Sequence, residues 1–522
     1  MPGIGLVGTM VTTAIIVLAI SLPIGLSDDP VINTTVLGDP YGGNTRAALF
    51  NGTPAPPVQL FPLHDPSRGE DVSFTTEHRC LPTCQTDYSS TCTDERYVSN
   101  NVFAQGPEED IPDPRGLSSL SAFFGQLVDH DMSKTRTEDT TFCSISLADL
   151  GPMVSPIAIK RTLVTLGNDA CRNPRLFITP YLDGTPWYGD YLNPERALSL
   201  RELTLGKLRL TAEDNLPRDP AKPQEFLAGD TRASEHVVLA LLHTVFARQH
   251  NRIVAMLHED VPTWSDEQLY WKARRIVNAQ YQRIIYEEWL PALFGTFYGQ
   301  TTLGLEGVEE ACRMDHGVVG TTILKTEFAQ AAFRYGHSAV PNRLGVFNLT
   351  DLFFNATLFE ELGADRVTME MVATPAQRVD AKVVDTLRNT LFGTHGLDLV
   401  SLNIARGREL GVAGYDDTAT CYSGTPHQNR RSFSHQDLFV RLLEDPLLAG
   451  SSLPELLAKI IASQFLDLCR GDRFFYARQE AIDDIGTKYY PLVTSATIKG
   501  ILVDNTNVDP ASVPDNAFFM PV

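Results

Sequence analysis

The stretch FFGQLVDHDM, residues 123 to 132, ends in three consecutive ionisable side chains, Asp129, His130 and Asp131. Histidine and carboxylate groups transfer protons and bind metal ions in many proteins. The preceding residues are apolar and predict a helix, in which successive side chains point about 100° apart. A single solvated helix face cannot accommodate three side chains that point in three directions. We therefore expect Asp129, His130 and Asp131 to contact three different partners.

A second candidate group lies in AGDTRASEH, before the apolar run VVLALL. Asp230 or Thr231 can cap the N-terminus of a helix here. In that helix Arg232, Glu235 and His236 have the spacing i, i+3, i+4 and share one face. A solvated Arg–Glu pair would give the same pattern, but the apolar continuation favours a helix that lies in the core.

Two further segments carry candidate ligands. His337 follows an apolar helical stretch in AAFRYGHSAV, where it is either a satisfied core residue or a ligand. LNIARGREL contains Asn403, Arg406 and Arg408, with Asn403 and Arg406 one turn apart. Buried arginines need an anionic partner, which is either a bound carboxylate ligand or an Asp or Glu side chain.

Helical periodicity dominates from Gly116 onward, so helices are expected to position these side chains. Residues 28–115 are rich in Pro, Gly, Asp and Thr and are expected to be mostly irregular. Strand signals are few and short. The sequence therefore predicts one large, mainly α domain over 116–522 with a loop-rich N-terminal segment. The expected helices are 117–131, 231–258, 266–289, 326–336, 381–392 and 453–468.

Composition limits the class of protein. The chain has 522 residues, 43% of them hydrophobic, enough to bury a large core. Its net charge of −21 argues against nucleic-acid binding, which needs a basic face.

The N-terminus carries no charged side chain from Met1 to Ser27. We interpret residues 1–27 as a cleaved secretory signal, with an uncleaved membrane anchor as the alternative. Four glycosylation sequons and an even number of cysteines, eight, agree with export to an oxidising compartment. No CxxC pair is present, so a zinc site is not expected. The sequons begin at Asn33, Asn51, Asn348 and Asn355.

In this order and at these separations, the segments resemble the animal haem peroxidases of the peroxidase–cyclooxygenase superfamily. The resemblance runs from about Gly116 to Phe519 and includes YLDGTPWYG, ARRIVNAQYQRIIYEEWLPALFG and GDRFF. It implies a secreted or surface-exposed enzyme that binds haem b and Ca²⁺.

The resemblance also implies roles for the opening triplet. His130 looks like the distal histidine over the iron, with Gln126 lining the peroxide and small-anion pocket. Asp129 faces the haem edge, where it would form an ester with a haem methyl group. Asp131 resembles a calcium ligand.

The other segments surround the same haem. Arg232 resembles the distal arginine and Glu235 the second ester-forming carboxylate. His337 looks like the proximal iron ligand. Asn403 would accept a hydrogen bond from the Nδ1–H group of His337. Arg334 and Arg406 are candidates for the haem propionates.

The loop TPYLDGT resembles the family's calcium loop. Two hydroxyls, one carbonyl and two carboxylates would supply the oxygens that Ca²⁺ prefers. Besides Asp131, these ligands are Thr179, Tyr181, Asp183 and Thr185.

The implied activity is peroxidase chemistry through a ferryl intermediate. Neutral His130 would move a proton from the iron-bound oxygen of hydrogen peroxide to the leaving oxygen, and Arg232 would stabilise the developing charge. The oxidised haem would then oxidise bromide, iodide, thiocyanate or a phenolic donor. His236 stands where the strongest chloride oxidiser of the family has a methionine, so we expect chloride to be a poor substrate.

Other departures from the family pattern leave questions. The chain reads Glu409-Leu410 where the family usually has Asp-His. The pairing of Cys80, Cys84 and Cys92 stays open, while we expect Cys143 to pair with Cys171.

Two short motifs bear on alternative functions. FRYGHS lacks the Trp and Pro of the cyclooxygenase branch, which argues against that activity. CRGDRFF contains Arg470-Gly471-Asp472, an integrin-type tripeptide of an adhesion protein. We interpret it instead as part of the family framework GDRF.

Overall fold

The computed structural model describes residues 76–77, 92, 94–106, 110–166, 172–190, 193–202, 204–298, 312, 323–393, 396–424 and 437–521. The expected leader 1–27, the sequons at Asn33 and Asn51, and Cys80, Cys84 and Cys171 lie outside these residues. Within the described part of the chain, no helix is long and apolar enough to cross a membrane.

The described chain is mainly helical, and its strands are short and arranged in two-stranded sheets. This confirms the predicted mainly α fold. The helices are α1 Glu95–Val102, α2 Ser119–Met132, α3 Thr185–Tyr188, α4 Pro194–Ser199, α5 Val237–Asp260, α6 Asp266–Ile284, α7 Leu290–Phe294, α9 Thr326–Gln330, α10 Gly336–Ala339, α11 Ala356–Ala373, α12 Asp385–Asn389, α13 Leu399–Glu409, α14 Tyr415–Ser423, α15 Leu438–Glu444, α16 Glu455–Gly471, α17 Gln479–Ile485, α18 Pro491–Thr494 and α19 Ile498–Asp504. The strands are β1 Thr76–Glu77, β2 Ala104–Gln105, β3 Thr137–Ile145, β4 Ile157–Thr162, β5 Val164–Leu166, β6 Arg172–Pro174, β7 Arg218–Asp219, β8 Lys222–Phe226, β9 Leu324–Lys325, β10 Arg343–Leu344, β11 Phe347–Asn348 and β12 Val383–Val384.

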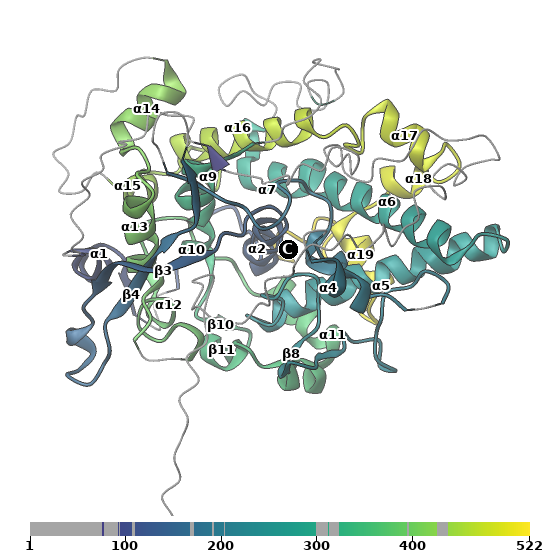
Figure 1. Cartoon of the computed structure of the whole chain (residues 1–522), viewed down its shortest axis with the longest axis horizontal. Coiled ribbons are helices and arrows are strands. Elements are labelled where there is room, and N and C mark those ends of the chain that lie inside the picture. Colours follow the sequence, from purple (N-terminus) through teal and green to yellow (C-terminus); the bar gives the residue numbers. More distant parts are fainter. Residues whose placement is uncertain are drawn as a thin grey trace, which may run out of the picture.

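Helix α2 lies near the middle of the molecule (Figure 1). Side chains from most of its circumference are buried, as expected for a helix enclosed by others. It packs against α3, α5, α10 and α11. Its N-terminus also contacts the last part of the chain, which lies beside it in Figure 1: Ser118 N–H donates to Phe518 O, and Phe124 packs edge-on against the Phe518 ring.

Helix α5 begins later than predicted. The expected start was residue 231, but residues 231–236 form turns, and His236 is the N-cap residue. The His236 Nδ1 atom accepts a hydrogen bond from Val238 N–H at 3.1 Å. The turn is held instead by Asp230, whose N–H donates to Pro186 O and whose Oδ1 accepts from Arg232 N–H. The prediction that Arg232, Glu235 and His236 share one helical face, capped by Asp230 or Thr231, is therefore wrong.

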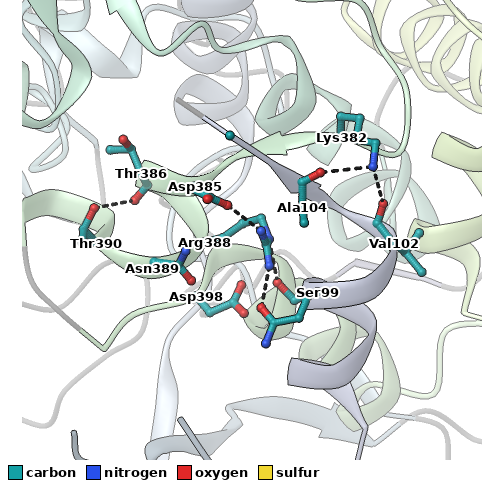
Figure 2. A network of polar contacts seen from close by, with 12 residues as sticks. Ser99, Val102, Ala104, Lys382, Asp385, Thr386, Arg388, Asn389, Thr390 and Asp398 are labelled. Atoms are coloured by element: carbon teal, nitrogen blue, oxygen red, sulfur yellow. Dashed lines mark hydrogen bonds and ion pairs between the residues drawn. The ribbon is translucent and has the colours of Figure 1, made fainter. Parts of the chain in front are cut away.

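The residues before Gly116 that the structure describes pack onto the helical core. Helix α1 packs against α13, and β2 pairs in parallel with β12. Figure 2 shows how polar contacts join these parts: Arg388 of α12 donates to Ser99 of α1 and to Asp385, and Lys382 donates to the carbonyls of Val102 and Ala104. These contacts join α1 and β2 to α12 and to the segment that precedes it.

Two disulfides join described residues, Cys92–Cys143 and Cys312–Cys469. The expected Cys143–Cys171 pair is therefore wrong. Cys92 immediately precedes α1, and the packing of α1 on α13 brings it within a Cα–Cα distance of 5.5 Å of Cys143 on strand β3. A disulfide needs this short separation, which sequence distance does not reveal.

Candidate active site

A cavity lies between helix α2, the turn before α5 and the segments around α10 and α13. The structure brings together in its lining all nine residues that the sequence suggested for a haem site. Apolar side chains including Phe333, Phe353, Leu391 and Phe392 form much of the remaining wall, which suits a large flat apolar ligand. The nine residues are Gln126, Asp129, His130, Arg232, Glu235, Arg334, His337, Asn403 and Arg406.

His130 is buried at the end of α2 and is held neutral. Burial and the nearby Arg232 lower the pKa of His130 well below its usual range. Its Nε2 atom lies 3.9 Å from Glu235 Oε2, which also accepts a hydrogen bond of 3.1 Å from Gln126. Its Nδ1 atom has no hydrogen-bond partner among the described residues. A neutral imidazole in this position can accept and return a proton.

Two carboxyl groups in the cavity are hard to ionise. Burial raises the pKa of Asp129 to about 6, opposed by the positive charges of Arg232 and Arg334. Burial raises the pKa of Glu235 to about 8, so this side chain is largely protonated at neutral pH. A buried carboxyl group that carries no charge avoids the cost of an unpaired buried anion.

Arg232 is fixed by Asp230, a residue that sequence reasoning treated only as a possible helix cap. Arg232 Nε donates to Asp230 Oδ1 at 2.8 Å, and Arg232 Nη2 donates to Oδ2 at 3.0 Å. Lys134 Nζ also lies 3.2 Å from Asp230 Oδ2. Burial opposes ionisation of Asp230, yet Arg232 and Lys134 hold its pKa well below the usual range. The only signal in the sequence was the two-residue spacing of Asp230 and Arg232.

His337 and Asn403 line the cavity from α10 and α13. The Asn403 amide nitrogen lies 2.8 Å from His337 Nδ1, and the amide oxygen accepts a hydrogen bond from Arg334. The expected contact has the oxygen of Asn403 facing a protonated Nδ1. A half-turn of the terminal amide would bring its oxygen to Nδ1, but it would also turn the NH₂ group towards the donating Arg334 guanidinium. Burial and Arg334 lower the pKa of His337 to about 3, so its ring is neutral and able to bind a metal ion.

The other two arginines of the cavity, Arg334 and Arg406, differ in their partners. Arg406 donates to Glu409 Oε2 at 2.9 Å and to Thr162 Oγ1 at 2.6 Å, so its anionic partner is a side chain of the protein. Arg334 donates to neutral oxygens of Ala329, Gln330 and Asn403, and no described carboxylate lies within ion-pair distance of it. Burial and Arg406 lower the pKa of Arg334 to about 10. A buried guanidinium without a carboxylate fits an anionic group of a bound ligand.

A second group of oxygen atoms lies around Asp131, the residue after His130, and the loop before α3. Asp183 accepts hydrogen bonds from the hydroxyls of Thr179 at 2.9 Å and Thr185 at 2.8 Å. Asp131 Oδ2 accepts from Gly184 N–H at 3.2 Å, while Asp131 Oδ1 has no partner in the described part of the chain. Burial and the charge of Asp183 raise the pKa of Asp131 well above its usual range. Two buried carboxylates that repel each other fit a divalent cation with oxygen ligands.

The same residues do not meet every criterion of a metal centre. Tyr181, the fifth expected ligand, is buried in the same loop. No group of three or more His, Cys, Asp or Glu side chains that could hold a metal is found among the described residues. The arrangement around Asp131 therefore depends on hydroxyl and carbonyl oxygens as well as its two carboxylates, which is acceptable for Ca²⁺ but not for zinc.

His236 also lines the cavity, where its ring stacks on Phe123 with a centroid distance of 4.3 Å. Burial lowers the pKa of His236 to about 3, so the ring adds no charge to the cavity. Its Nε2 atom has no partner among the described residues.

The Arg470-Gly471-Asp472 tripeptide lies at the end of α16. Asp472 is buried, and its carboxylate accepts hydrogen bonds from Gln282 Nε2 and Phe474 N–H, each at 2.8 Å. This carboxylate therefore serves an internal contact of the fold.

The chain is similar in sequence to known peroxidases. The family model described as animal haem peroxidase matches residues 72–436 and 427–518. Eosinophil peroxidase of Mus musculus is 30% identical over 502 residues, covering 80% of this chain and 68% of that protein. Chorion peroxidase of Drosophila melanogaster is 29% identical over 375 residues, covering 63% of this chain and 46% of that protein.

Solved structures share the fold at lower identity. Peroxidase A from Dictyostelium discoideum superposes with a TM-score of 0.71 at 21% identity, covering 86% of this chain and 96% of that one. A fatty acid alpha-dioxygenase from Oryza sativa gives a TM-score of 0.68 at 19% identity, covering 81% of this chain and 80% of that one.

Proposed function

This chain belongs to the animal haem peroxidase family and is a haem-dependent peroxidase, and from that premise we propose that it uses hydrogen peroxide to oxidise bromide, iodide, thiocyanate or phenolic donors. The observation that carries the proposal is a single cavity lined by neutral His130 and Arg232 and, from other elements of the fold, by His337 and Asn403.

His337 would bind the haem iron, with Asn403 fixing the orientation of its ring. Arg334 is the better candidate for a haem propionate, because Arg406 already pairs with Glu409. Bound haem supplies an iron centre that accepts two oxidising equivalents from hydrogen peroxide.

His130 would take a proton from one peroxide oxygen and return it to the other, which then leaves as water. This role requires a neutral imidazole, and the low pKa of His130 supports it. Arg232 would stabilise the negative charge that develops on the leaving oxygen. The ion pair with Asp230 holds the guanidinium in place for this purpose.

We further propose that Asp129 and Glu235 form esters with haem methyl groups, in which a carboxylate O–C bond would replace a methyl C–H bond and hydrogen peroxide would take up the two electrons. Both line the cavity from separate segments, and burial raises the pKa of each, so conversion to an ester would remove a carboxylate charge that burial disfavours. The proposed calcium ligands are Asp131, Thr179, Asp183, Thr185 and the carbonyl of Tyr181, supported by the unpartnered Oδ1 atom of Asp131.

We also propose that the protein acts outside the cell. The uncharged leader, the sequons and the disulfides Cys92–Cys143 and Cys312–Cys469 support this location, because disulfides persist in oxidising compartments.

The function is tested by a Soret spectrum and by turnover with chloride, bromide, iodide, thiocyanate and a phenol. His337→Ala should lose the haem band, whereas His130→Ala should keep it and lose reaction with peroxide. Wild-type protein that folds in the presence of haem without a Soret band would overturn the proposal.

A further inference from the structure

Helix α6 runs beside the proposed calcium site and holds its loop. Asn278 Nδ2 donates to Asp183 O at 2.6 Å, and Gln282 Nε2 donates to Leu182 O at 3.0 Å. Residues 278, 281 and 282 are spaced by three and four positions and share one face of the helix. That face therefore points at the loop that carries Asp183.

Tyr281 lies on this face and is completely buried. Its ring packs among Phe124, Trp187 and Phe246, with centroid distances of 5.9, 5.1 and 5.5 Å. Phe124 and Asp131 are seven residues apart on α2 and therefore share a face of that helix. Trp187 follows the loop residue Thr185 by two positions. The Tyr281 ring thus contacts both segments that supply the proposed ligands.

The Tyr281 hydroxyl and the Asp131 Oδ1 atom are both buried without a hydrogen-bond partner among the described residues. Unpaired buried polar atoms are uncommon and costly in folded proteins. Burial raises the pKa of Tyr281 well above its usual range, and the charges of Asp131 and Asp183 raise it further. No hydrogen bond joins the Tyr281 hydroxyl to either carboxylate among the described residues.

We propose that Tyr281 extends the calcium site into helix α6, with its hydroxyl donating to a water molecule that Asp131 Oδ1 and the cation share. Such a water has three polar partners, which is the usual number for a buried water. Tyr281 is then a positioning residue that acts through this water. The inference rests on the calcium site proposed above.

The variant Tyr281→Phe tests this idea because the two interpretations predict opposite signs. If the hydroxyl is simply unpaired, its removal leaves calcium affinity unchanged and raises Tm with or without calcium. If it belongs to the site, Tyr281→Phe lowers calcium affinity by about tenfold, the lower end of the effect expected for outer-shell partners. The variant then also has a lower Tm in calcium, but not in chelator.

Tyr286→Phe is the matched control, because the Tyr286 hydroxyl donates to Phe465 O at 2.6 Å, a contact within the protein. It should lower Tm equally with calcium and with chelator. Folding of Tyr281→Phe is monitored by its Tm in chelator, where it should be at least as stable as the wild type.

Calcium affinity is measured by titration and by competition with Tb³⁺, whose emission Trp187 should sensitise in wild type and variant alike. A wild type that binds neither ion overturns the calcium site and this inference together. Wild-type binding that Tyr281→Phe leaves unchanged overturns this inference alone.

Discussion

The variant Asp230→Asn should weaken the fold and misplace Arg232, because Asp230 is a buried anion that holds two cations. The amide keeps an oxygen that can accept from Arg232 N–H and Nε. At the other position its NH₂ group meets two donors, Arg232 Nη2 and Lys134 Nζ. Two charge-assisted hydrogen bonds are lost, each worth roughly 1.5–3 kcal/mol, so we expect a destabilisation of about 3–6 kcal/mol.

This loss should depend on pH. The folded-state pKa of Asp230 lies well below that of an unfolded aspartate, so its ionisation stabilises the fold above the unfolded-state pKa, about 3.9. That stabilisation disappears as pH falls through the folded-state pKa. The difference in Tm between wild type and Asp230→Asn should therefore be large at pH 7 and shrink below about pH 4.

The assay is thermal unfolding of both proteins across this pH range, with peroxide reactivity measured on the haem-loaded forms. Glu360→Gln is the matched control, because Glu360 forms an exposed pair with Arg218 that should contribute at most about 1 kcal/mol. Asp230→Asn should retain haem but react more slowly with peroxide, since Arg232 is no longer held. A loss of Tm no larger than in the control, or one that is equal at pH 7 and pH 3, would refute the reasoning.

Four further predictions concern the cavity. After peroxide treatment, wild-type haem should resist acid–butanone extraction; Asp129→Asn and Glu235→Gln should each lose one ester, and full release of unmodified haem from the wild type would contradict the esters. With His236 in place, turnover of bromide, iodide or thiocyanate should exceed chloride turnover at neutral pH, and equal chloride and bromide rates would disprove this. Arg334→Gln should weaken haem retention by roughly tenfold or more in a haem-transfer assay, the equivalent of one charge-assisted hydrogen bond. Arg406→Gln should instead destabilise the haem-free protein, because it removes the 2.9 Å ion pair with the buried Glu409 carboxylate and leaves Arg161, at 3.8 Å, as the other cation in ion-pair range.

The fold class and the set of cavity residues could be predicted from the sequence, because they depend on helical periodicity and on motifs in a fixed order. The start of α5 could not, since Arg232 and Glu235 are both compatible with helix. Two contacts of Asp230 hold residues 231–236 in a turn. Its N–H donates to Pro186 O, which joins segments far apart in the sequence, and its carboxylate accepts from Arg232.

Pairing of side chains was equally hard to predict. Cys143 bonds Cys92 because α1 docks on α13, a contact between parts of the chain about 300 residues apart. The partner of Arg406 was left open, although Glu409 lies three residues further along the same helix and could have been favoured on that spacing.

The contact between α2 and the last residues of the chain has a consequence for biosynthesis. Ser118 bonds the carbonyl oxygens of both Ala517 and Phe518, and Leu117 bridges to Phe519, at the start of the helix that carries His130. Residue 118 is synthesised long before residue 517. Until residues 517–519 are made, the start of α2 in the nascent chain lacks the contacts that cover it. Haem that binds before residues 517–519 are in place would meet a cavity whose wall is not yet held. Cofactor insertion should therefore follow the synthesis of residues 517–519, and the exposed helix makes the earlier intermediate a candidate for chaperone binding.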